Sequence, residues 1–240
     1  MILAVDAGNT RLKWGLHDGG SWLEKGWVAT ADAAQLADAW RELAPPDRIV
    51  ASNVAGFGVR ARLTEVCRRW PAEIHWAVAG ESLCGVRNGY DNPAQLGSDR
   101  WAALIAARAV APRGSVVVNA GTALTVDALS ADGRFLGGLI APGLAAMRRA
   151  LAESTAAVSA DGGRFDIFPG NTADAVYTGA LSAMAGAVER MAAALLEAQG
   201  DDPTRLLSGG DAQLLLPLLS GETMMMDNLV LEGLIRIALA

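Results

Sequence analysis

The chain has 240 residues, of which 52% are hydrophobic and 19% charged, and 27 are glycine. This composition excludes disordered and fibrous proteins and is typical of a globular chain with one large domain or two smaller ones. Twenty lysine and arginine residues against 26 aspartate and glutamate residues give a formal charge of −6, the wrong sign for a protein that neutralises nucleic-acid phosphates.

The first elements along the chain predict a three-stranded meander. Short apolar runs at 2–6, 12–17 and 22–30 are separated by Gly-rich breaks. They are followed by a helical composition over 31–43, a strand-like run at 48–54, helical spacing over 59–70 and a strand-like run at 73–78. The predicted order is βββαβαβ.

The pattern restarts after a helix with Trp101, Leu104 and Ile105 on its apolar side. Pro112-Arg113-Gly114 follows that helix, and we predict two domains, 1–112 and 113–240. The second half is predicted to contain strands at 115–119, 124–129, 133–140 and 205–207, a long helix from Thr172 to about 198, a Leu-rich helix after 212 and a closing helix at 228–239.

The two halves also share a local sequence pattern. VDAGNTRLKWGL from Val5 aligns without gaps on VNAGTALTVDAL from Val118, which places Asp6 on Asn119 and Asn9 on Thr122. Both segments open a three-stranded meander, and this coincidence indicates a duplicated domain.

The segment DAGNT suits a turn that binds phosphate. Gly8 permits close approach of the main chain, Asn9 and Thr10 add donors, and Asp6 at the strand end can hold a metal ion that bridges phosphates. A single loop of this kind is more often an ordinary polar hairpin turn, but two related loops in one chain favour phosphate binding. The sequence contains no GxxxxGK[ST] motif and no protein-kinase HRD or DFG set.

Paired phosphate loops in a duplicated domain resemble the actin-like ATPase superfamily, which includes sugar and acetate kinases. The resemblance implies an α/β fold of two ribonuclease H-like domains, each a mixed sheet flanked by helices, with nucleotide in the cleft between the halves. A more specific resemblance rests on five motifs in order: DAGNTRLKWG at 6–15, GSDR at 97–100, NAGTALTVD at 119–127, GNT at 170–172 and SGGDA at 208–212. Each motif is weak alone, but the ordered set spans nearly the whole chain and is similar to type III pantothenate kinases.

This resemblance implies an ATP-dependent kinase that phosphorylates pantothenate to 4′-phosphopantothenate in coenzyme A synthesis. Asp99 matches the general base that accepts the proton of the pantothenate hydroxyl. The positions implied to bind ATP and its phosphates are Asp6, Ala7, Gly8, Asn9, Thr10, Arg11, Leu12, Lys13, Gly121, Thr122, Gly209 and Gly210. The positions implied to bind substrate are Tyr90, Gly97, Ser98, Asp99, Arg100 and Thr172.

Several of these residues also have purely structural interpretations. Asp99 follows Ser98, a candidate N-cap, and an acid in the first turn of a helix complements the helix dipole. Tyr90 suits packing against a turn, Thr172 suits a plain helix N-cap, and Asp211 suits the N-cap of the helix after SGGDA. On helix statistics alone the structural interpretation of Asp99 is the commoner one, and only the resemblance reverses it.

The resemblance further implies magnesium with ATP and a monovalent cation, K⁺ or NH₄⁺. Asp6 is the candidate magnesium ligand, and Asp127 is a second carboxylate for the phosphates or a solvated strand residue. Asn119 stands where many family members have the Asp that helps to hold potassium. Asn retains an oxygen ligand but lacks the charge, so potassium dependence is left open.

The expected setting is the cytoplasm, and the expected assembly is a homodimer whose active site borrows residues from the neighbouring subunit. Cys67 and Cys84 are too few for a disulfide framework, and the N-terminus lacks the pattern of a signal peptide. The most apolar stretch, predicted at 135–152, is interrupted by glycines, Pro142, Arg148 and Arg149, so we expect no membrane span and no nucleic-acid partner.

Two other functions compete with the pantothenate kinase hypothesis. The same phosphate loops would serve another small-molecule kinase acting on a sugar or an acyl group, and a substrate panel separates the two. A nucleotide-binding regulatory protein without turnover is the third hypothesis, and the acids Asp6 and Asp99 argue against it.

Overall fold

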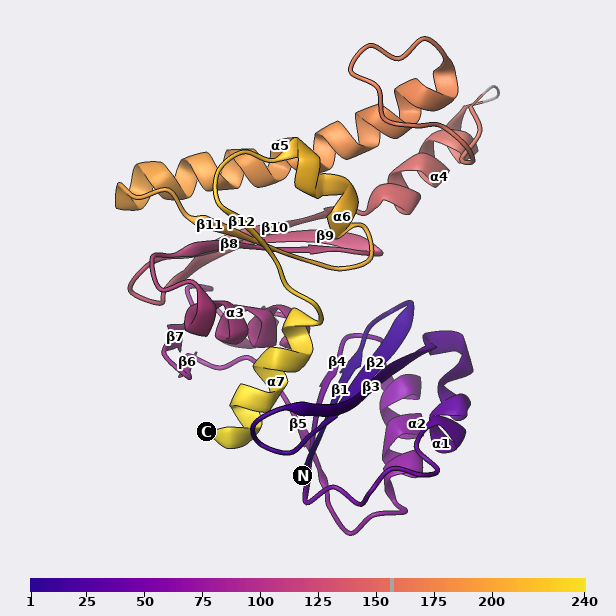
Figure 1. The fold of residues 1–240 in the computed structure, drawn as a ribbon, viewed down its shortest axis with the longest axis vertical. Coiled ribbons are helices and arrows are strands. Elements are labelled where there is room, and N and C mark those ends of the chain that lie inside the picture. The colour runs from indigo at the N-terminus through magenta and orange to yellow at the C-terminus, as the bar shows by residue number, and fades with distance from the viewer. Residues whose placement is uncertain (156–157) are drawn as a thin grey trace. The chain divides into compact units, whose positions relative to one another are not determined.

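The structure is a computed structural model that describes residues 1–155 and 158–240 (Figure 1). The chain forms two compact units, Met1–Val110 together with Asn228–Ala240, and Ala111–Asp227. The predicted second domain ran to residue 240, but the closing helix packs on strands of the first unit. The apolar side of this helix is buried against the first sheet. The second domain therefore ends at Asp227, and residues 228–240 belong to the first unit.

The first unit contains a five-stranded mixed sheet. Its strands are β1 (Ile2–Ala7), β2 (Arg11–His17), β3 (Trp22–Ala29), β4 (Arg48–Asn53) and β5 (Ile74–Trp76), in the order β3-β2-β1-β4-β5. Strand β1 is antiparallel to β2 and parallel to β4. The helices are η1 (Thr30–Gln35), α1 (Leu36–Ala39), α2 (Phe57–Cys67), η2 (Pro93–Gln95), α3 (Ser98–Val110) and α7 (Leu229–Leu239), and β6 (Ser82–Leu83) pairs with β7 (Val86–Arg87).

Alternation along the strands divides the two faces of this sheet. Leu3, Val5, Leu12 and Trp14 face a core that includes Trp40 and the buried side of α2. The opposite face packs against α7 and α3. The helix expected over 31–43 is shorter than predicted, because Ala29 offers no capping side chain and Asp32 leaves helical torsions (φ −107°, ψ 30°).

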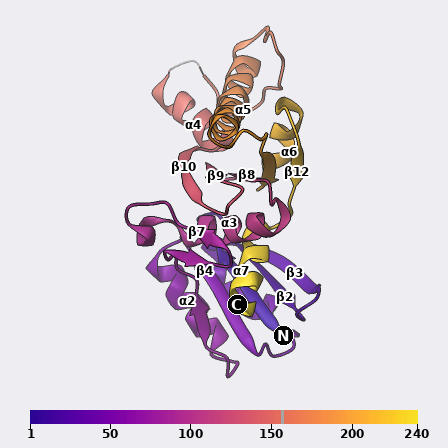
Figure 2. The same ribbon diagram turned by 90° about the vertical axis from the view of Figure 1, so that its left-hand side faces the viewer.

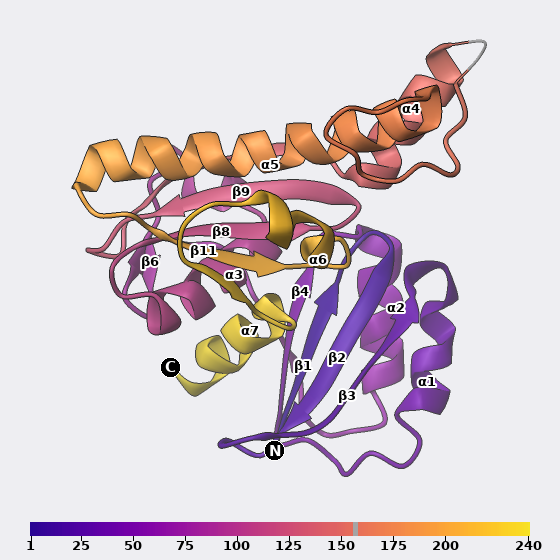
Figure 3. The same cartoon turned by 45° about the horizontal axis from the view of Figure 1, so that its top comes forward.

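The second unit repeats the same topology. Strands β8 (Ser115–Ala120), β9 (Ala123–Leu129), β10 (Phe135–Pro142), β11 (Thr204–Ser208) and β12 (Thr223–Met225) follow the order β10-β9-β8-β11-β12. Helices α4 (Leu144–Ser154), α5 (Thr172–Gln199), α6 (Ala212–Leu215) and η3 (Leu216–Leu218) complete the unit. Helix α5 runs along one face of the sheet, with α4 beside its N-terminal part (Figures 2 and 3).

Helix α5 is long and apolar enough to span a membrane by length and composition, with a mean hydropathy of 1.2. The stretch that the sequence singled out, 135–152, instead forms β10 and most of α4. Leu181, Met184 and Val188 of α5 are buried in the core of the second unit. Of the apolar window of α5, 39% is buried inside the structure.

The duplication is confirmed by strand order and burial, with one correction to the alignment. Strands β1 and β8 have the same pattern of buried positions, and so do β2 and β9. Ala7 pairs with Leu12 across the first hairpin, whereas Ala120 pairs with Leu124 across the second, so the second loop is one residue shorter. The gapless alignment is therefore wrong beyond Gly8, and Thr10 rather than Asn9 corresponds to Thr122.

Candidate functional site

A row of polar side chains crosses the first sheet where β1 ends. Ser52 of β4, Asp6 of β1 and Lys13 of β2 are neighbours in the strand registers and therefore share one face. The Oδ1 atom of Asp6 is buried, and it has no hydrogen-bond partner among the described residues. An acceptor in this position is available to a cation or a donor that enters from outside the chain.

The electrostatics of this row are unusual. The pKa of Asp6 is raised to about 7, first because burial disfavours the charged carboxylate and second because the negative charge of Asp99 lies nearby, whereas Lys13 lowers it. Two acids from distant parts of the sequence thus act on each other at one place. A divalent cation would favour both ionised carboxylates there.

The start of α3 brings Asp99 to this row. The amide of Trp101 donates to the carbonyl of Gly97 at 2.9 Å, so Gly97 occupies the position before the first helical residue, where Ser98 was expected. The hydroxyls of Ser98 and Ser52 are 2.9 Å apart, which ties the helix to β4. A Cβ on Gly97 would lie 2.6 Å from Oδ1 of Asp99, so the glycine leaves the space that this carboxylate occupies.

Tyr90 and Arg100 form a second feature of the first unit. Nη1 of the buried Arg100 donates to the hydroxyl of Tyr90 at 3.0 Å, and its guanidinium carbon lies 5.7 Å from the centre of the tyrosine ring. The tyrosine therefore fixes a buried cation rather than only packing against the turn. The pair thus places a positive charge and a phenolic hydroxyl side by side in the first unit.

The first loop, Gly8 to Thr10, is fastened by Thr30, the first residue of η1. The amide of Gly8 donates to the carbonyl of Arg11 at 3.1 Å. Thr30 holds the other side of the loop, because its hydroxyl donates to the carbonyl of Gly8 at 2.7 Å and its amide donates to that of Thr10 at 3.0 Å. These bonds keep the loop in one shape before any ligand binds.

The second loop is fastened in an equivalent way. The amide of Gly121 donates to the carbonyl of Ala123, and the amide of Gly143 donates to that of Thr122, both at 3.1 Å. A Cβ on Gly143 would lie only 2.0 Å from the carbonyl oxygen of Gly121. Gly143 is thus required by the loop, and it takes the position that Thr30 has in the first unit.

The motif SGGDA lies against the same loop. Gly209 has φ +102°, and a Cβ there would lie 2.2 Å from the carbonyl oxygen of Ala120. The amide of Asp211 donates to that oxygen at 3.0 Å, and its side chain makes no capping bond to α6. Gly210 has open space around its Cβ position. The motif therefore belongs to the second loop region, although its two glycines have different roles.

Asn119 and Asp127 lie on one face of the second sheet. Asn119 pairs with Thr125 and Val117 pairs with Asp127 in the antiparallel register, so the two polar side chains point to the same side. Asp127 is buried rather than solvated. Within residues 1–155 and 158–240, no group of three His, Cys, Asp or Glu side chains is arranged to hold a metal ion.

The GNT motif lines a cavity of about 820 Å³ in the second unit. Thr172 is the first residue of α5, but the N-cap is Asn171, whose side-chain oxygen accepts from the amide of Asp174 at 2.9 Å. The simple capping interpretation of Thr172 is therefore wrong. The cavity is lined by Pro142, Met147, Ala150, Leu151, Pro169, Gly170, Asn171, Thr172, Ala175, Val176, Gly179 and Ala180.

Comparison with known proteins identifies the family. The profile of the type III pantothenate kinases matches residues 2–194. A type III pantothenate kinase of Nitrosospira multiformis is 55% identical over 238 residues, which cover 99% of this chain and 91% of that protein. The chain belongs to the type III pantothenate kinase family. The resemblance read from the sequence is thereby confirmed.

Two solved structures have a fold similar to that of this member of the type III pantothenate kinase family. A candidate Baf family transcriptional activator from Campylobacter jejuni has a TM-score of 0.63 at 21% identity and covers 96% of this chain and 94% of its own. A candidate 2-dehydro-3-deoxygalactonokinase from Sinorhizobium meliloti has a TM-score of 0.59 at 15% identity and covers 99% and 98%. Together with the repeated sheet topology, these likenesses confirm the predicted duplicated α/β fold.

Three residues that lie beside sequence-predicted positions were not themselves predicted. Ser52 ends β4 beside Asp6, Gly143 follows β10, and Asn171 precedes Thr172. The signal for Gly143 was present, because it stands where Thr30 stands in the duplicated pattern. Ser52 gave no signal, since a single serine after an apolar strand is common.

Proposed function

We infer that the chain is an ATP-dependent pantothenate kinase that forms 4′-phosphopantothenate, the first step of coenzyme A biosynthesis. The observation that carries this inference is the family match over most of the chain. The interacting acids Asp6 and Asp99, beside Lys13, supply the kind of charge arrangement that phosphoryl transfer needs.

In this function Asp99 is the general base. Its carboxylate accepts the proton of the pantothenate hydroxyl as that oxygen forms a bond to the γ-phosphorus of ATP. The bond from the γ-phosphorus to the bridging oxygen breaks, and ADP leaves with the electron pair. Gly97 and Ser98 keep the carboxylate in place, since the glycine leaves room for it and the serine anchors the helix start.

Asp6 fits the role of magnesium ligand. Its buried Oδ1 atom lacks a partner among the described residues, and burial together with the nearby charge of Asp99 raises its pKa to about 7 in spite of Lys13. A bound magnesium ion would neutralise phosphate charge there. The absence of a three-residue cluster in the described part of the chain agrees with a cation held largely by phosphate oxygens. Asp127 is the weaker candidate, because it lies in the second unit within a strand.

Pantothenate binding is assigned to Tyr90, Arg100 and Thr172. The buried guanidinium of Arg100, held by the hydroxyl of Tyr90, supplies a cation for the pantothenate carboxylate. Thr172 adds a hydroxyl at the N-terminus of a long helix, where anionic groups are favoured.

A homodimer is the proposed assembly, in the cytoplasm. The cavity beside Thr172 is bordered by apolar side chains, and the loop before it exposes Ile167 by 73% and Phe168 by 87%. Exposed apolar groups that cluster around a cavity are typical of a surface covered by a partner. Sedimentation of the purified protein tests this assembly, and a monomer at micromolar concentration would contradict it.

Potassium or ammonium activation is proposed to be weak. Asn119 occupies the position in β8 that Asp6 has in β1, and its amide oxygen carries no net charge for a monovalent cation.

The decisive experiment is a coupled assay of ADP release with purified protein, Mg-ATP and pantothenate, in sodium, potassium and ammonium buffers. We expect turnover in all three, with only a modest gain from potassium. Turnover with sugars or acyl acids instead of pantothenate would favour the other kinase hypothesis. ATP binding without any turnover would favour the regulatory hypothesis.

A further inference from the structure

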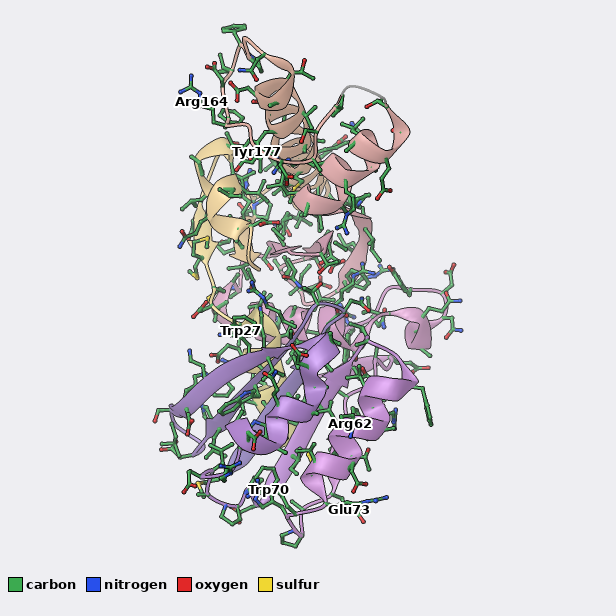
Figure 4. All side chains as sticks on the ribbon, turned by 90° about the vertical axis from the view of Figure 1, so that its right-hand side faces the viewer. Trp27, Arg62, Trp70, Glu73, Arg164 and Tyr177 are labelled. Atoms are coloured by element: carbon green, nitrogen blue, oxygen red, sulfur yellow. The ribbon has the colours of Figure 1, made fainter. Side chains whose placement is uncertain are left out.

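An exposed tryptophan stands beside the first phosphate loop. Trp27 projects from β3, the edge strand of the first sheet, with 58% of its surface exposed (Figure 4). In the strand register Trp27 lies directly opposite Lys13, which lies opposite Asp6. The three side chains therefore form one cross-strand row on the face that carries the candidate site.

The position of Trp27 is not explained by core packing. Its neighbour Val28 points to the other face and is buried in the core, as alternation requires. A large, half-exposed aromatic ring on the polar face of an edge strand contributes little to folding. Its neighbours on that face are charged, so its interactions with them are the feature to explain.

The ring of Trp27 contacts Arg11, the residue that closes the first loop. The guanidinium carbon of Arg11 lies 4.5 Å from the ring centre, a distance typical of a cation–π contact. The carbonyl of Arg11 is held by the amide of Gly8, which fixes the backbone of this residue beside the loop. In residues 1–155 and 158–240, no carboxylate forms an ion pair with Arg11, so its charge is open to a ligand.

The second hairpin provides an internal comparison. Ala123 takes the place of Arg11, and Ile140, opposite Thr125, takes the place of Trp27. The cation and the ring are thus both present in the first unit and both missing from the second. Because Arg11 and Trp27 occur together and contact each other, we interpret them as acting as a pair.

We propose that Trp27 is a positioning residue, which holds the guanidinium of Arg11 beside the first loop so that it binds a nucleotide phosphate. This inference rests on the proposed function of that loop and adds a residue that no sequence motif marked. An arginine side chain loses conformational entropy when it binds a ligand. The ring of Trp27 already restricts Arg11 in the free protein, so less entropy is lost when Arg11 binds a phosphate. The effect is therefore on ATP affinity and not on proton transfer.

A double-mutant cycle tests the pair. Trp27→Leu is expected to raise the KM for ATP about two- to fivefold, the scale of one cation–π contact, with kcat and the KM for pantothenate nearly unchanged. Trp27→Phe should restore most of the loss, because it keeps an aromatic face. In an Arg11→Ala background, Trp27→Leu should have no further effect on ATP, since its partner is already gone.

The matched control is the Arg60 and Trp76 pair of the same unit, where the guanidinium carbon lies 4.4 Å from the ring. Trp76→Leu removes the same kind of contact away from the loop and should leave the KM for ATP unchanged. Melting temperatures of all variants identify any loss of fold, and calorimetric titration with a non-hydrolysable ATP analogue separates binding from turnover.

The inference is overturned if Trp27→Leu binds the analogue like the parent protein, or if its effect is the same with and without Arg11. Its failure is distinguishable from failure of the proposed function. A parent protein without pantothenate turnover but with coupled effects of Arg11 and Trp27 on analogue binding would contradict the function and support the pair.

Discussion

The two hairpins that open the two units have the same pattern of buried positions but different polar side chains beside the loop. Burial patterns agree strand by strand between β1 and β8 and between β2 and β9. On the face that carries the candidate site, Asp6, Arg11, Lys13 and Trp27 of the first unit correspond to Asn119, Ala123, Thr125 and Ile140 of the second. The comparison teaches that the shared pattern of buried positions keeps the geometry of the hairpin, whereas the residues beside the loop can acquire or omit charge.

The largest expected effect comes from Asp99, the acid in the first turn of α3. Asp99→Asn should lower kcat by a factor of roughly 10² to 10⁴, because the amide cannot accept the proton of the pantothenate hydroxyl. ATP affinity, measured by calorimetry, should be largely retained. Asp91→Asn is the control, since Asp91 is an exposed acid of the preceding segment. Full activity of the Asp99 variant would remove that residue from the role of base.

The second loop depends on backbone fit instead of charge. Gly209→Ala should lower the free energy of unfolding by about 1 to 3 kcal/mol and weaken ATP binding, because Gly209 has φ +102° and its Cβ would meet the carbonyl of Ala120. Gly210→Ala should change stability by less than about 0.5 kcal/mol, since open space surrounds that position. Urea unfolding measures both variants, and equal losses would contradict the assigned roles.

Asp6 is expected to lower the stability of the folded protein at neutral pH while being needed for turnover. The pKa of Asp6 is raised to about 7 in the folded state. Between about pH 4 and pH 7 the folded state therefore holds a proton that the unfolded state has released. The contribution of this group to the free energy of unfolding is lost as the pH rises toward 7. Asp6→Asn should remove that loss and raise the free energy of unfolding at pH 7 by about 1 to 3 kcal/mol, while lowering turnover. The gain over the parent protein should grow from pH 5 to pH 7 and be constant above, as followed by unfolding in the absence of nucleotide and magnesium. A gain that shrinks as the pH rises would contradict the assignment.

A subtler change moves the carboxylate of Asp99 without removing it. Gly97→Ala places a Cβ 2.6 Å from Oδ1 of Asp99, so the side chain must turn away. We expect kcat to fall about tenfold with little change in melting temperature, because displacement of a reacting group by a fraction of an ångström is enough. Gly80→Ala, which meets no neighbouring atom, is the matched control.

The smallest expected effect comes from adding charge to the second hairpin. Asn119→Asp should increase the ratio of turnover in potassium to turnover in sodium on the order of threefold, the scale of one partly exposed charge interaction. Steady-state rates in the two salts measure this ratio. An unchanged ratio would show that position 119 does not act on the monovalent cation.

Much of the site depended on contacts that sequence spacing does not encode. The proximity of Asp6 to Asp99 and Lys13 follows from the strand register and the start of α3, and Ser52 enters through the parallel pairing of β1 with β4. A motif marks residues that are near in sequence, whereas these groups meet across strands. No sequence motif marked Trp27. Its partner Arg11 lies on the neighbouring strand, so their contact depends on strand pairing and not on sequence spacing.

The sequence by itself determined the family, through its ordered motifs, and the duplicated α/β fold with the sequence of its main strands and helices along the chain, through the pattern of apolar residues. Only the tertiary structure decided that the second loop is one residue shorter, that Asn171 caps α5 and that the closing helix belongs with the first unit. The physical reason is the same in each case. Periodicity reports which side of an element is apolar, but hydrogen bonds and packing between elements decide what that side meets.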